Sequence, residues 1–200
     1  VIIKEADRLQ DLMQRLLSSH RVMQAAQVNI PEILERARRL IHAEFPGVHV
    51  QRDYDTSLPA LTGDREQLIQ AILNIARNAA QAISGSTKDA PSTGEITFRT
   101  RAVRQVTLVK RHYRLALELQ VIDNGPGIPD AIRDRIFYPL VSGRENGSGL
   151  GLTLAQSFVQ QHGGTIDVSS RPGNTTFSIC LPLNPERAAT AANVVNGNDT

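Results

Sequence analysis

A glycine-rich segment that passes directly into a helix-like segment is the feature that most restricts how this chain can fold. Residues 143–152 read GRENGSGLGL, and TLAQSFVQQHG follows at once. Glycines let backbone amides approach a ligand closely, and a helix N-terminus carries partial positive charge. The pattern predicts a phosphate-binding loop at the start of a helix. The alternative interpretation is a flexible loop without a ligand.

A second signal is an acid at the end of an expected strand. The run before Asp123 alternates, with one apolar face formed by Leu115, Leu117, Leu119 and Val121. The turn DNGPGIP then follows, at 123–129. An ionised Asp only accepts hydrogen bonds, so it selects the exocyclic amine of adenine over the carbonyl of guanine. An ordinary Asp-Asn-Gly corner is the alternative.

The third signal is a helix expected over 64–82, with Asp64 as N-cap. Its apolar side is formed by Leu68, Ile72, Ile75, Ala79 and Ile83, and a stripe of neutral amides by Gln67, Gln70, Asn74, Asn78 and Gln81. A solvated face is normally rich in Lys and Glu, and Asn is a poor helix former. An amide oxygen is a suitable ligand for Mg2+, which completes its shell with phosphates and water. A polar surface stripe is the alternative.

The segment 171–182, RPGNTTFSICLP, predicts a turn followed by an alternating strand. The hydroxyl of Thr175, near the start of this strand, is expected to share a water or a hydrogen bond with Asp123. An ordinary hairpin is the alternative.

The order and spacing of these segments resemble the catalytic domain of sensor histidine kinases. NIARN at 74–78 is similar to the N box, DNGPGIP to the G1 box, IFYPL at 136–140 to the F box, GSGLGL at 147–152 to the G2 box and GNTTF at 173–177 to the G3 box. The family lies within the superfamily of gyrase, Hsp90 and MutL ATPases. The run FYPLVSGRENGSGLGL is especially similar to nitrogen-regulation kinases of the NtrB type, and the resemblance covers roughly residues 1–183.

The resemblance implies an ATP site with Mg2+ and assigns roles by position. Asn78 is the implied metal ligand with Asn74 as its companion, and Asp123 is the implied adenine acceptor. Arg77 and Arg144 are candidates for phosphate contacts, with solvated surface Arg as the alternative. The remaining nucleotide contacts implied are Gly125, Gly127, Ile128, Gly147, Gly149, Leu150, Gly151, Leu152 and Thr175.

The resemblance also implies which reaction this site performs. Hydrolytic members of the superfamily carry a water-activating Glu where this chain has Asn74. The implied reaction is therefore transfer of the γ-phosphoryl group of ATP to a protein histidine, with Asn74, Asn78 and Arg144 as catalytic candidates. A hydrolytic ATPase and a regulatory module that uses ATP as a structural ligand are the alternatives.

Two departures from the family pattern stand out. Gly173-Asn174-Thr175 is one residue shorter than the generic G3 box, as in NtrB-type kinases. The phosphoacceptor motif is absent, because none of the histidines has its context: His20, His42, His49, His112 and His162. We expect His162, in QHGG at a helix end, to cap that helix as a cation.

The sequence predicts one catalytic domain with two appended segments. Residues 1–20 are similar to the second helix of the kinase dimerisation hairpin, because 1–18 carry a short heptad seam; an amphipathic helix packed on its own domain is the alternative. Residues 21–183 form the ATP-binding domain, and 184–200 a polar tail. The chain begins with Val1, which agrees with a fragment of a longer kinase.

Composition limits the possible partners. A net charge of +2, with 4% aromatic residues and no Trp, offers no stacking surface for nucleic acid. No apolar run approaches the length of a membrane span, and the single Cys180 suits a reducing cytoplasm. The resemblance implies as partners the phosphoacceptor domain, a response regulator and a PII-type signal protein, with a homodimer in the full-length kinase. The PII-type protein would dock on the basic region of Lys110, Arg111 and Arg114 or on the lid, although these charges are also typical of a solvated surface.

The expected fold is an α/β (α+β) two-layer sandwich, in which helices cover one face of a mixed, mostly antiparallel sheet. Helices are expected at 31–43, 64–82 and 149–162, and strands near 25–29 and at 48–54, 93–103, 113–122, 164–169 and 175–181. The segment 129–147, between the G1 and G2 boxes, is expected to form a lid over the nucleotide, with a short helix at 130–136 and mobility when ATP is absent.

Overall fold

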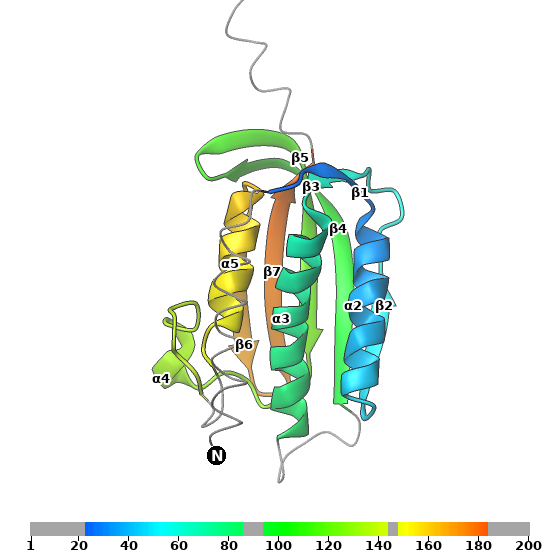
Figure 1. Ribbon diagram of the computed structural model, residues 1–200. Helices are drawn as coiled ribbons and strands as arrows, with labels where there is room; N and C mark the ends of the chain where they lie inside the picture. The colour runs from blue at the N-terminus through cyan, green and yellow to red at the C-terminus, as the bar shows by residue number, and fades with distance from the viewer. Residues whose placement is uncertain (1–22, 86–93, 144–147, 184–200) are drawn as a thin grey trace, which may run out of the picture.

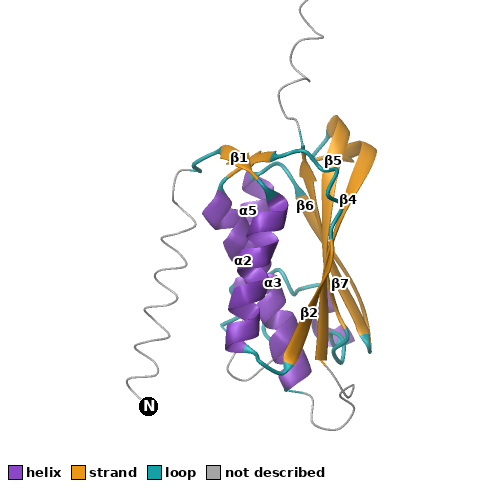
Figure 2. Ribbon diagram, turned by 90° about the vertical axis from the view of Figure 1, so that its right-hand side faces the viewer, coloured by secondary structure: helices purple, strands orange, loops and turns teal. Residues whose placement is uncertain are grey.

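The structure is a computed structural model that describes residues 23–85, 94–143 and 148–183. The predictions for 1–20 and 184–200, and for Arg144 and Gly147, lie outside these residues. Figure 2 shows two layers, with the helices on one face of the main sheet. The expected two-layer sandwich is therefore confirmed.

The main sheet has five strands in the order β2-β4-β5-β7-β6. Strand β2 pairs in parallel with β4, and every other neighbouring pair is antiparallel. The bounds are Val48–Asp53 for β2, Gly94–Leu108 for β4, Arg111–Asp123 for β5, Thr165–Arg171 for β6 and Asn174–Pro182 for β7. The mixed, mostly antiparallel sheet follows the prediction.

Three long helices cover this sheet, and they are α2 (Ile30–Glu44), α3 (Arg65–Ser84) and α5 (Gly151–Gln161). A one-turn helix, α4 (Asp130–Arg133), is shorter than the 130–136 helix expected. A second, two-stranded sheet joins β1 (Ala26–Val28) to β3 (Leu61–Gly63). Strand β3 was not predicted, because three residues are too few to show periodicity. Among the described residues, no helix is long and apolar enough to cross a membrane.

Helix α3 occupies the centre of the helical layer, between α2 and α5 (Figure 1). The Asp64 carboxylate caps it by accepting hydrogen bonds from the amides of Glu66 and Gln67, at 3.0 and 3.1 Å. The apolar side expected from the sequence is buried throughout. Within the amide stripe, Gln67 and Asn74 are also buried and lie against α5, whereas Gln81, near the end of α3, is exposed. The stripe is therefore only partly a surface feature.

His162, which follows α5, links the end of that helix to the start of α3. Its Nδ1 lies 2.6 Å from the Phe158 carbonyl oxygen, and its Nε2 accepts a hydrogen bond from the Asp64 amide at 2.9 Å. A ring that donates at Nδ1 and accepts at Nε2 is neutral. Burial lowers the pKa of His162, although the Phe158 carbonyl and the Asp64 carboxylate favour the charged form. His162 therefore caps the end of α5 as expected, but as a neutral ring and not as a cation.

The basic connector expected at 104–112 is mostly strand. Strand β4 continues to Leu108 and β5 begins at Arg111, so only Val109 and Lys110 remain for the turn. A small cluster of Leu108, Tyr113 and Ala116 forms the core of this hairpin end. The prediction ended the first strand too early and began the second too late, because the basic side chains of the ribbon were interpreted as a loop. They are exposed on paired strands whose register breaks at Gln105 and Arg114, where Gln105 has a φ of 53°.

Candidate functional site

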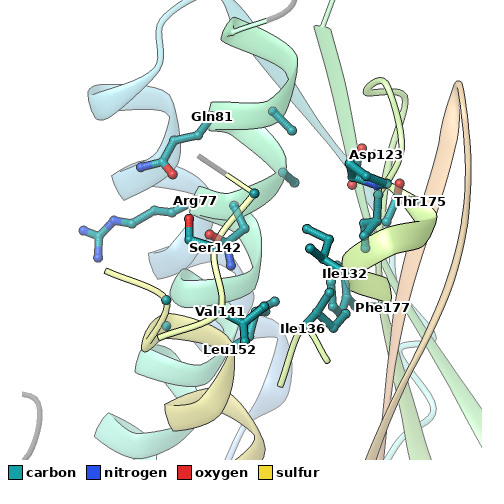
Figure 3. Close-up of a pocket in the computed structure, with 18 of the residues that line it drawn as sticks. Arg77, Gln81, Asp123, Ile132, Ile136, Val141, Ser142, Leu152, Thr175 and Phe177 are labelled. Carbon is teal, nitrogen blue, oxygen red and sulfur yellow. The ribbon is translucent and has the colours of Figure 1, made fainter. Parts of the chain in front are cut away.

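A cavity of about 620 Å3 opens between α3, the start of α5 and the G1 turn (Figure 3). Most of the nucleotide contacts implied by the resemblance line this cavity, and they are Asn74, Arg77, Asn78, Asp123, Gly127, Ile128, Gly149, Gly151, Leu152 and Thr175. Gly125 and Leu150 do not line it. A cavity of this size accommodates a nucleotide-sized ligand.

Asp123 and Thr175 lie together on the sheet side of the cavity (Figure 3). They are register partners on β5 and β7, at the ends of those strands next to the cavity, and both are buried. The Asp123 Oδ1 atom accepts a hydrogen bond from the Gly125 amide at 2.9 Å. A Cβ at position 125 would lie 2.8 Å from that oxygen, so Gly125 acts by leaving room for the carboxylate.

The G1 turn is fastened to the β6–β7 hairpin. The Gly173 amide donates to the Gly125 carbonyl oxygen at 2.8 Å, and the Ile128 amide donates to Ser170 Oγ at 2.8 Å. Gly127 has a φ of +88°, and a Cβ there would lie 3.0 Å from the Arg171 carbonyl carbon. Only glycine fits both the left-handed backbone and the close approach. Gly125 is therefore required by the nearby Asp123 carboxylate, and Gly127 by its left-handed backbone and the nearby Arg171.

Ser170 is a residue of this region that the sequence analysis missed. Its hydroxyl accepts from the Ile128 amide and lies 2.9 Å from Thr175 Oγ1. The serine comes from β6, the edge strand of the sheet, and a single serine in an alternating strand has no distinguishing sequence signal.

The amides of α3 form the opposite wall. Asn74 is 4% exposed, and its Oδ1 accepts from Gln70 Nε2 at 3.3 Å. Its Nδ2 has no hydrogen-bond partner within the described residues. Gly151 packs against it, since a Cβ at 151 would lie 3.8 Å from Asn74 Cβ. A buried donor without a partner at a cavity wall suits an acceptor supplied by a ligand, such as a phosphate oxygen.

The first turn of α5 also faces this region. Its N-cap residue is Leu150, which offers no side-chain hydrogen bond to the helix. The first amides of a helix need acceptors, and an anion satisfies them while interacting favourably with the helix dipole. The prediction of a helix N-terminus after the glycine loop is borne out, although the helix begins at Gly151 rather than at 149.

Arg77 lines the cavity, but its guanidinium points away from Asp123 and Thr175 (Figure 3). Its Nε donates to Glu44 Oε2 on α2 at 2.8 Å. The side chains of Arg77 and Glu44 are 34% and 42% exposed, so the pair is partly screened by water. This ion pair holds the Arg77 guanidinium toward α2.

The described part of the lid supplies an apolar wall that the sequence analysis did not assign. Ile132, Ile136 and Val141 line the cavity. Figure 3 shows Ile132 and Ile136 near Phe177, across the cavity from α3, and Val141 beside Leu152 at the start of α5. Leu140 has a φ of +65°, and its amide donates to the Gly149 carbonyl oxygen at 3.1 Å. The lid therefore contacts the glycine-rich loop at Gly149.

The donor set fits a magnesium ion only in combination with a ligand. Asn78 lines the cavity from α3 and offers an amide oxygen, a hard ligand of the kind that Mg2+ accepts. Mg2+ usually takes one or two protein ligands and completes its octahedron with phosphate oxygens and water. The residues present are compatible with that arrangement.

Comparison with known proteins bears on this site. Residues 63–185 match the family model described as histidine kinase-, DNA gyrase B-, and HSP90-like ATPase. The chain is 46% identical to the sensory histidine kinase/phosphatase NtrB of Vibrio alginolyticus, and 48% identical to that of Klebsiella oxytoca. Each match covers 92% of this chain and 51% of the relative. The chain thus spans about half the length of the curated relatives it matches.

Solved structures show the same fold. Full-length ShkA in complex with AMPPNP has a TM-score of 0.71 at 23% identity, covering 90% of this chain and 36% of that one. The mycobacterial sensor histidine kinase MprB has a TM-score of 0.63 at 25% identity, covering 78% and 97%. Histidine kinase ThkA in complex with the response regulator protein TrrA has a TM-score of 0.70 at 20% identity, covering 93% and 50%.

Proposed function

Because this chain belongs to the histidine kinase-, DNA gyrase B-, and HSP90-like ATPase family, we propose that its cavity binds Mg-ATP for transfer of the γ-phosphoryl group to a protein histidine. The relatives at 46–48% identity are sensory histidine kinases/phosphatases of the NtrB type, so the proposed pathway is a nitrogen-regulation two-component system. The acceptor histidine belongs to a dimerisation domain outside these residues.

One observation supports the nucleotide site above the others. A buried carboxylate, Asp123, stands at one side of the cavity, and buried Asn74 and the uncapped start of α5 stand at the other. The acid suits the exocyclic amine of adenine, and the helix start suits phosphate. Asn78 would hold Mg2+, which neutralises phosphate charge when bound. Arg144 and Gly147, outside the described residues, complete the proposed phosphate contacts.

In the proposed reaction the protein positions the nucleotide, and the acceptor imidazole performs the attack. A P–N bond forms to the histidine while the P–O bond to the β-phosphate oxygen breaks, and ADP leaves. A response regulator would then receive the phosphoryl group. The structure of ThkA with TrrA provides the precedent for such a partner in that kinase.

Hydrolysis is the alternative that the Asn74 position disfavours. A general base must lie within hydrogen-bond reach of the attacking water, and the amide of Asn74 accepts no proton. We therefore expect phosphate release by this chain alone to stay near the rate of a denatured control. Sustained multiple turnovers of ATP without an acceptor domain would support the hydrolytic alternative instead.

The test of the proposed function is ATP binding measured by calorimetry with and without Mg2+, for the unchanged chain, Asp123→Asn and Asn78→Ala. Asp123→Asn replaces an acceptor by an amide of the same size, and we expect affinity to fall at least about tenfold, because hydrogen bonds to charged groups contribute more than neutral ones. Asn78→Ala should reduce mainly the Mg2+-dependent part of binding. Both variants should retain the thermal stability of the unchanged chain without ligand.

Phosphotransfer then completes the test. The chain is mixed with labelled ATP and a separately supplied NtrB-type dimerisation domain, and phosphohistidine is detected by its acid lability. The chain alone should give no phosphohistidine. Unchanged ATP affinity in both variants would remove the site assignment, whereas normal ATP binding without transfer would favour the regulatory-module alternative.

A PII-type signal protein is part of the proposal, and the cationic end of the β4–β5 hairpin is its proposed docking surface. Arg104, Lys110, Arg111 and Arg114 are exposed there, and none of them forms an ion pair with any described residue. Clustered charge of one sign attracts a surface of the opposite sign and speeds association.

Charge reversal tests this docking surface. In the variant Lys110→Glu/Arg111→Glu/Arg114→Glu, binding to a purified PII-type protein should weaken strongly, while ATP affinity should stay the same because the hairpin end does not line the cavity. A matched control is the reversal of Arg36 and Arg65, exposed cations on α2 and α3. If PII binding survives the hairpin reversal, the surface is solvated charge and the lid becomes the docking candidate.

A further inference from the structure

The hydroxyl groups of Ser170 and Thr175 form a pair on the side of the cavity where Asp123 lies. Ser170 Oγ lies 2.9 Å from Thr175 Oγ1, and it accepts the Ile128 amide hydrogen at 2.8 Å. Thr175 is 3% exposed and lines the cavity, whereas Ser170 stands behind it on β6. Because each hydroxyl carries one hydrogen, the direction of one bond limits the direction of the next.

This series of hydrogen bonds begins at the Ile128 backbone amide, which can only donate. If the Ser170 hydroxyl donates to Thr175 Oγ1, the Ile128 amide hydrogen and the Ser170 hydroxyl hydrogen both have acceptors. The hydroxyl hydrogen of Thr175 is then free to point into the cavity. If Thr175 donates to Ser170 instead, the Ser170 hydrogen has no acceptor within the described residues. Each direction leaves one hydroxyl hydrogen without an acceptor among the described residues, but only the first leaves it on Thr175, which lines the cavity and where a bound base can accept it.

This direction matches the edge of adenine. Adenine presents a donor at its 6-amine and an acceptor at N1, and guanine presents an acceptor at O6 and a donor at N1. Asp123, an acceptor, and Thr175 are register partners on neighbouring strands, so the two side chains stand next to each other on the wall. A Thr175 hydroxyl that donates completes the pattern required for adenine, directly or through one bound water.

We propose that Ser170 is a positioning residue for base selection, which orients the Thr175 hydroxyl as a donor to adenine N1 and fastens the G1 turn through the Ile128 amide. Ser170 does not contact the nucleotide itself. The inference rests on the proposed ATP site, and it adds to that site a residue that selects adenine by acting through Thr175.

The test compares the dissociation constants of two ligands for two variants, measured by calorimetry with Mg2+. The ligands are ADP and 1-deaza-ADP, in which a C–H group replaces N1. The variants are Ser170→Thr and Ser170→Val. These two side chains have nearly the same shape and both suit a strand, but only threonine retains the hydroxyl. Ser169→Ala, at the exposed neighbouring position, is the matched control.

We expect the unchanged chain, Ser170→Thr and the control to bind 1-deaza-ADP about tenfold more weakly than ADP, the effect of one hydrogen bond. Ser170→Val should bind ADP more weakly and lose little further affinity with 1-deaza-ADP, because the N1 donor is already misdirected. A smaller ratio between the two dissociation constants in Ser170→Val shows that Ser170 orients the Thr175 hydroxyl. General loosening of the strand would weaken the binding of both ligands equally.

An equal ratio between the two ligands in Ser170→Val and Ser170→Thr overturns the inference and leaves the proposed ATP site intact. Failure of the unchanged chain to bind ADP at all instead contradicts the proposed function. If Ser170→Val does not fold, Ser170→Ala, which also removes the hydroxyl, takes its place, and an unchanged ratio between ADP and 1-deaza-ADP in that variant overturns the inference in the same way.

Discussion

At the scale of single residues, the two glycines that precede and begin α5 differ in how much space surrounds them. Gly149 has a φ of +64°, and a Cβ there would lie 2.5 Å from the Leu140 carbonyl carbon. At Gly151 the nearest atoms to a Cβ would be those of Asn74, at 3.8 Å, which is an ordinary contact. The first glycine is therefore required by the protein's own backbone, and the second has room for a methyl group.

Substitution by alanine should separate these two roles. Gly149→Ala should cost about 1–2 kcal/mol from the left-handed backbone alone, and more from the contact with Leu140. It should lower the ligand-free melting temperature as well as ATP affinity. Gly151→Ala should leave the melting temperature unchanged and weaken ATP binding only by crowding the phosphates.

Differential scanning fluorimetry without ligand and calorimetry with ATP give the two readouts. A ligand-free melting temperature that falls equally in both variants would show that the difference in space around these glycines has no energetic consequence.

At the scale of secondary structure elements, the turn of the β4–β5 hairpin is strained. Val109 and Lys110 have φ values of 46° and 65°, a region that favours glycine and asparagine and in which valine is rare. Val109 is 63% exposed, so its side chain gains little from burial. The ladder from both strands and the cluster of Leu108, Tyr113 and Ala116 hold the turn in place. Strain of this kind persists only where surrounding contacts determine the backbone.

The double substitution Val109→Asn/Lys110→Gly should therefore stabilise the domain. Asn-Gly is the preferred sequence for a two-residue turn with positive φ at both positions. Relief of the backbone strain, less the entropy lost by glycine, should add about 1 kcal/mol, or roughly 2–4 °C in melting temperature.

Thermal unfolding monitored by circular dichroism measures this change, and ATP affinity serves as the control because the turn lies outside the cavity. A lower melting temperature would mean that the two side chains make a contribution larger than the strain they cause.

At the scale of the whole molecule, α5 connects the cavity to the opposite end of the domain. Its first turn packs against Asn74 beside the cavity, and the residue after its last turn, His162, accepts from the Asp64 amide. Asp64 also accepts from the Gln24 amide at 2.8 Å, near the start of the described chain. Burial raises the pKa of Asp64, but the amides of Gln24, Gln67 and Glu66 outweigh it and lower the pKa below its ordinary value.

This arrangement predicts a dependence of stability on pH. The pKa of His162 is lowered from 6.5 in the folded chain, so below pH 6.5 the unfolded chain binds a proton that the folded chain does not. The stability that neutral His162 provides is complete above pH 6.5 and falls as the pH decreases through the folded pKa. Asp64, with a pKa below its ordinary value of 3.8, loses its contribution only in more acidic solution.

Chemical unfolding of the unchanged chain and of His162→Gln at pH 7.5 and pH 5 tests this dependence. Glutamine retains a donor and an acceptor but does not titrate. The unchanged chain should lose more stability than the variant on going to pH 5. Equal losses in the two proteins would assign the pH dependence to other groups.

Much of the molecule follows from the sequence alone. The periodicities of α3 and β5 predicted a helix and a strand, because burial of one face imposes a period of about 3.6 or 2 residues on the sequence. The ordered motifs placed Asp123, Asn74, Asn78 and the glycines in one site, and all except Gly125 among the described members of that set line one cavity. The adjacency of Asp123 and Thr175 was also expected.

Tertiary structure decided what local pattern cannot encode. The neutral state of His162 depends on the Asp64 amide, 98 residues away in the chain. The ion pair of Arg77 with Glu44 and the hydroxyl pair of Ser170 and Thr175 depend on which elements become neighbours. Propensity and periodicity act over one helical turn or one strand, whereas the charge state of a buried group and the direction of a hydrogen bond are set by partners that only the packed fold brings together.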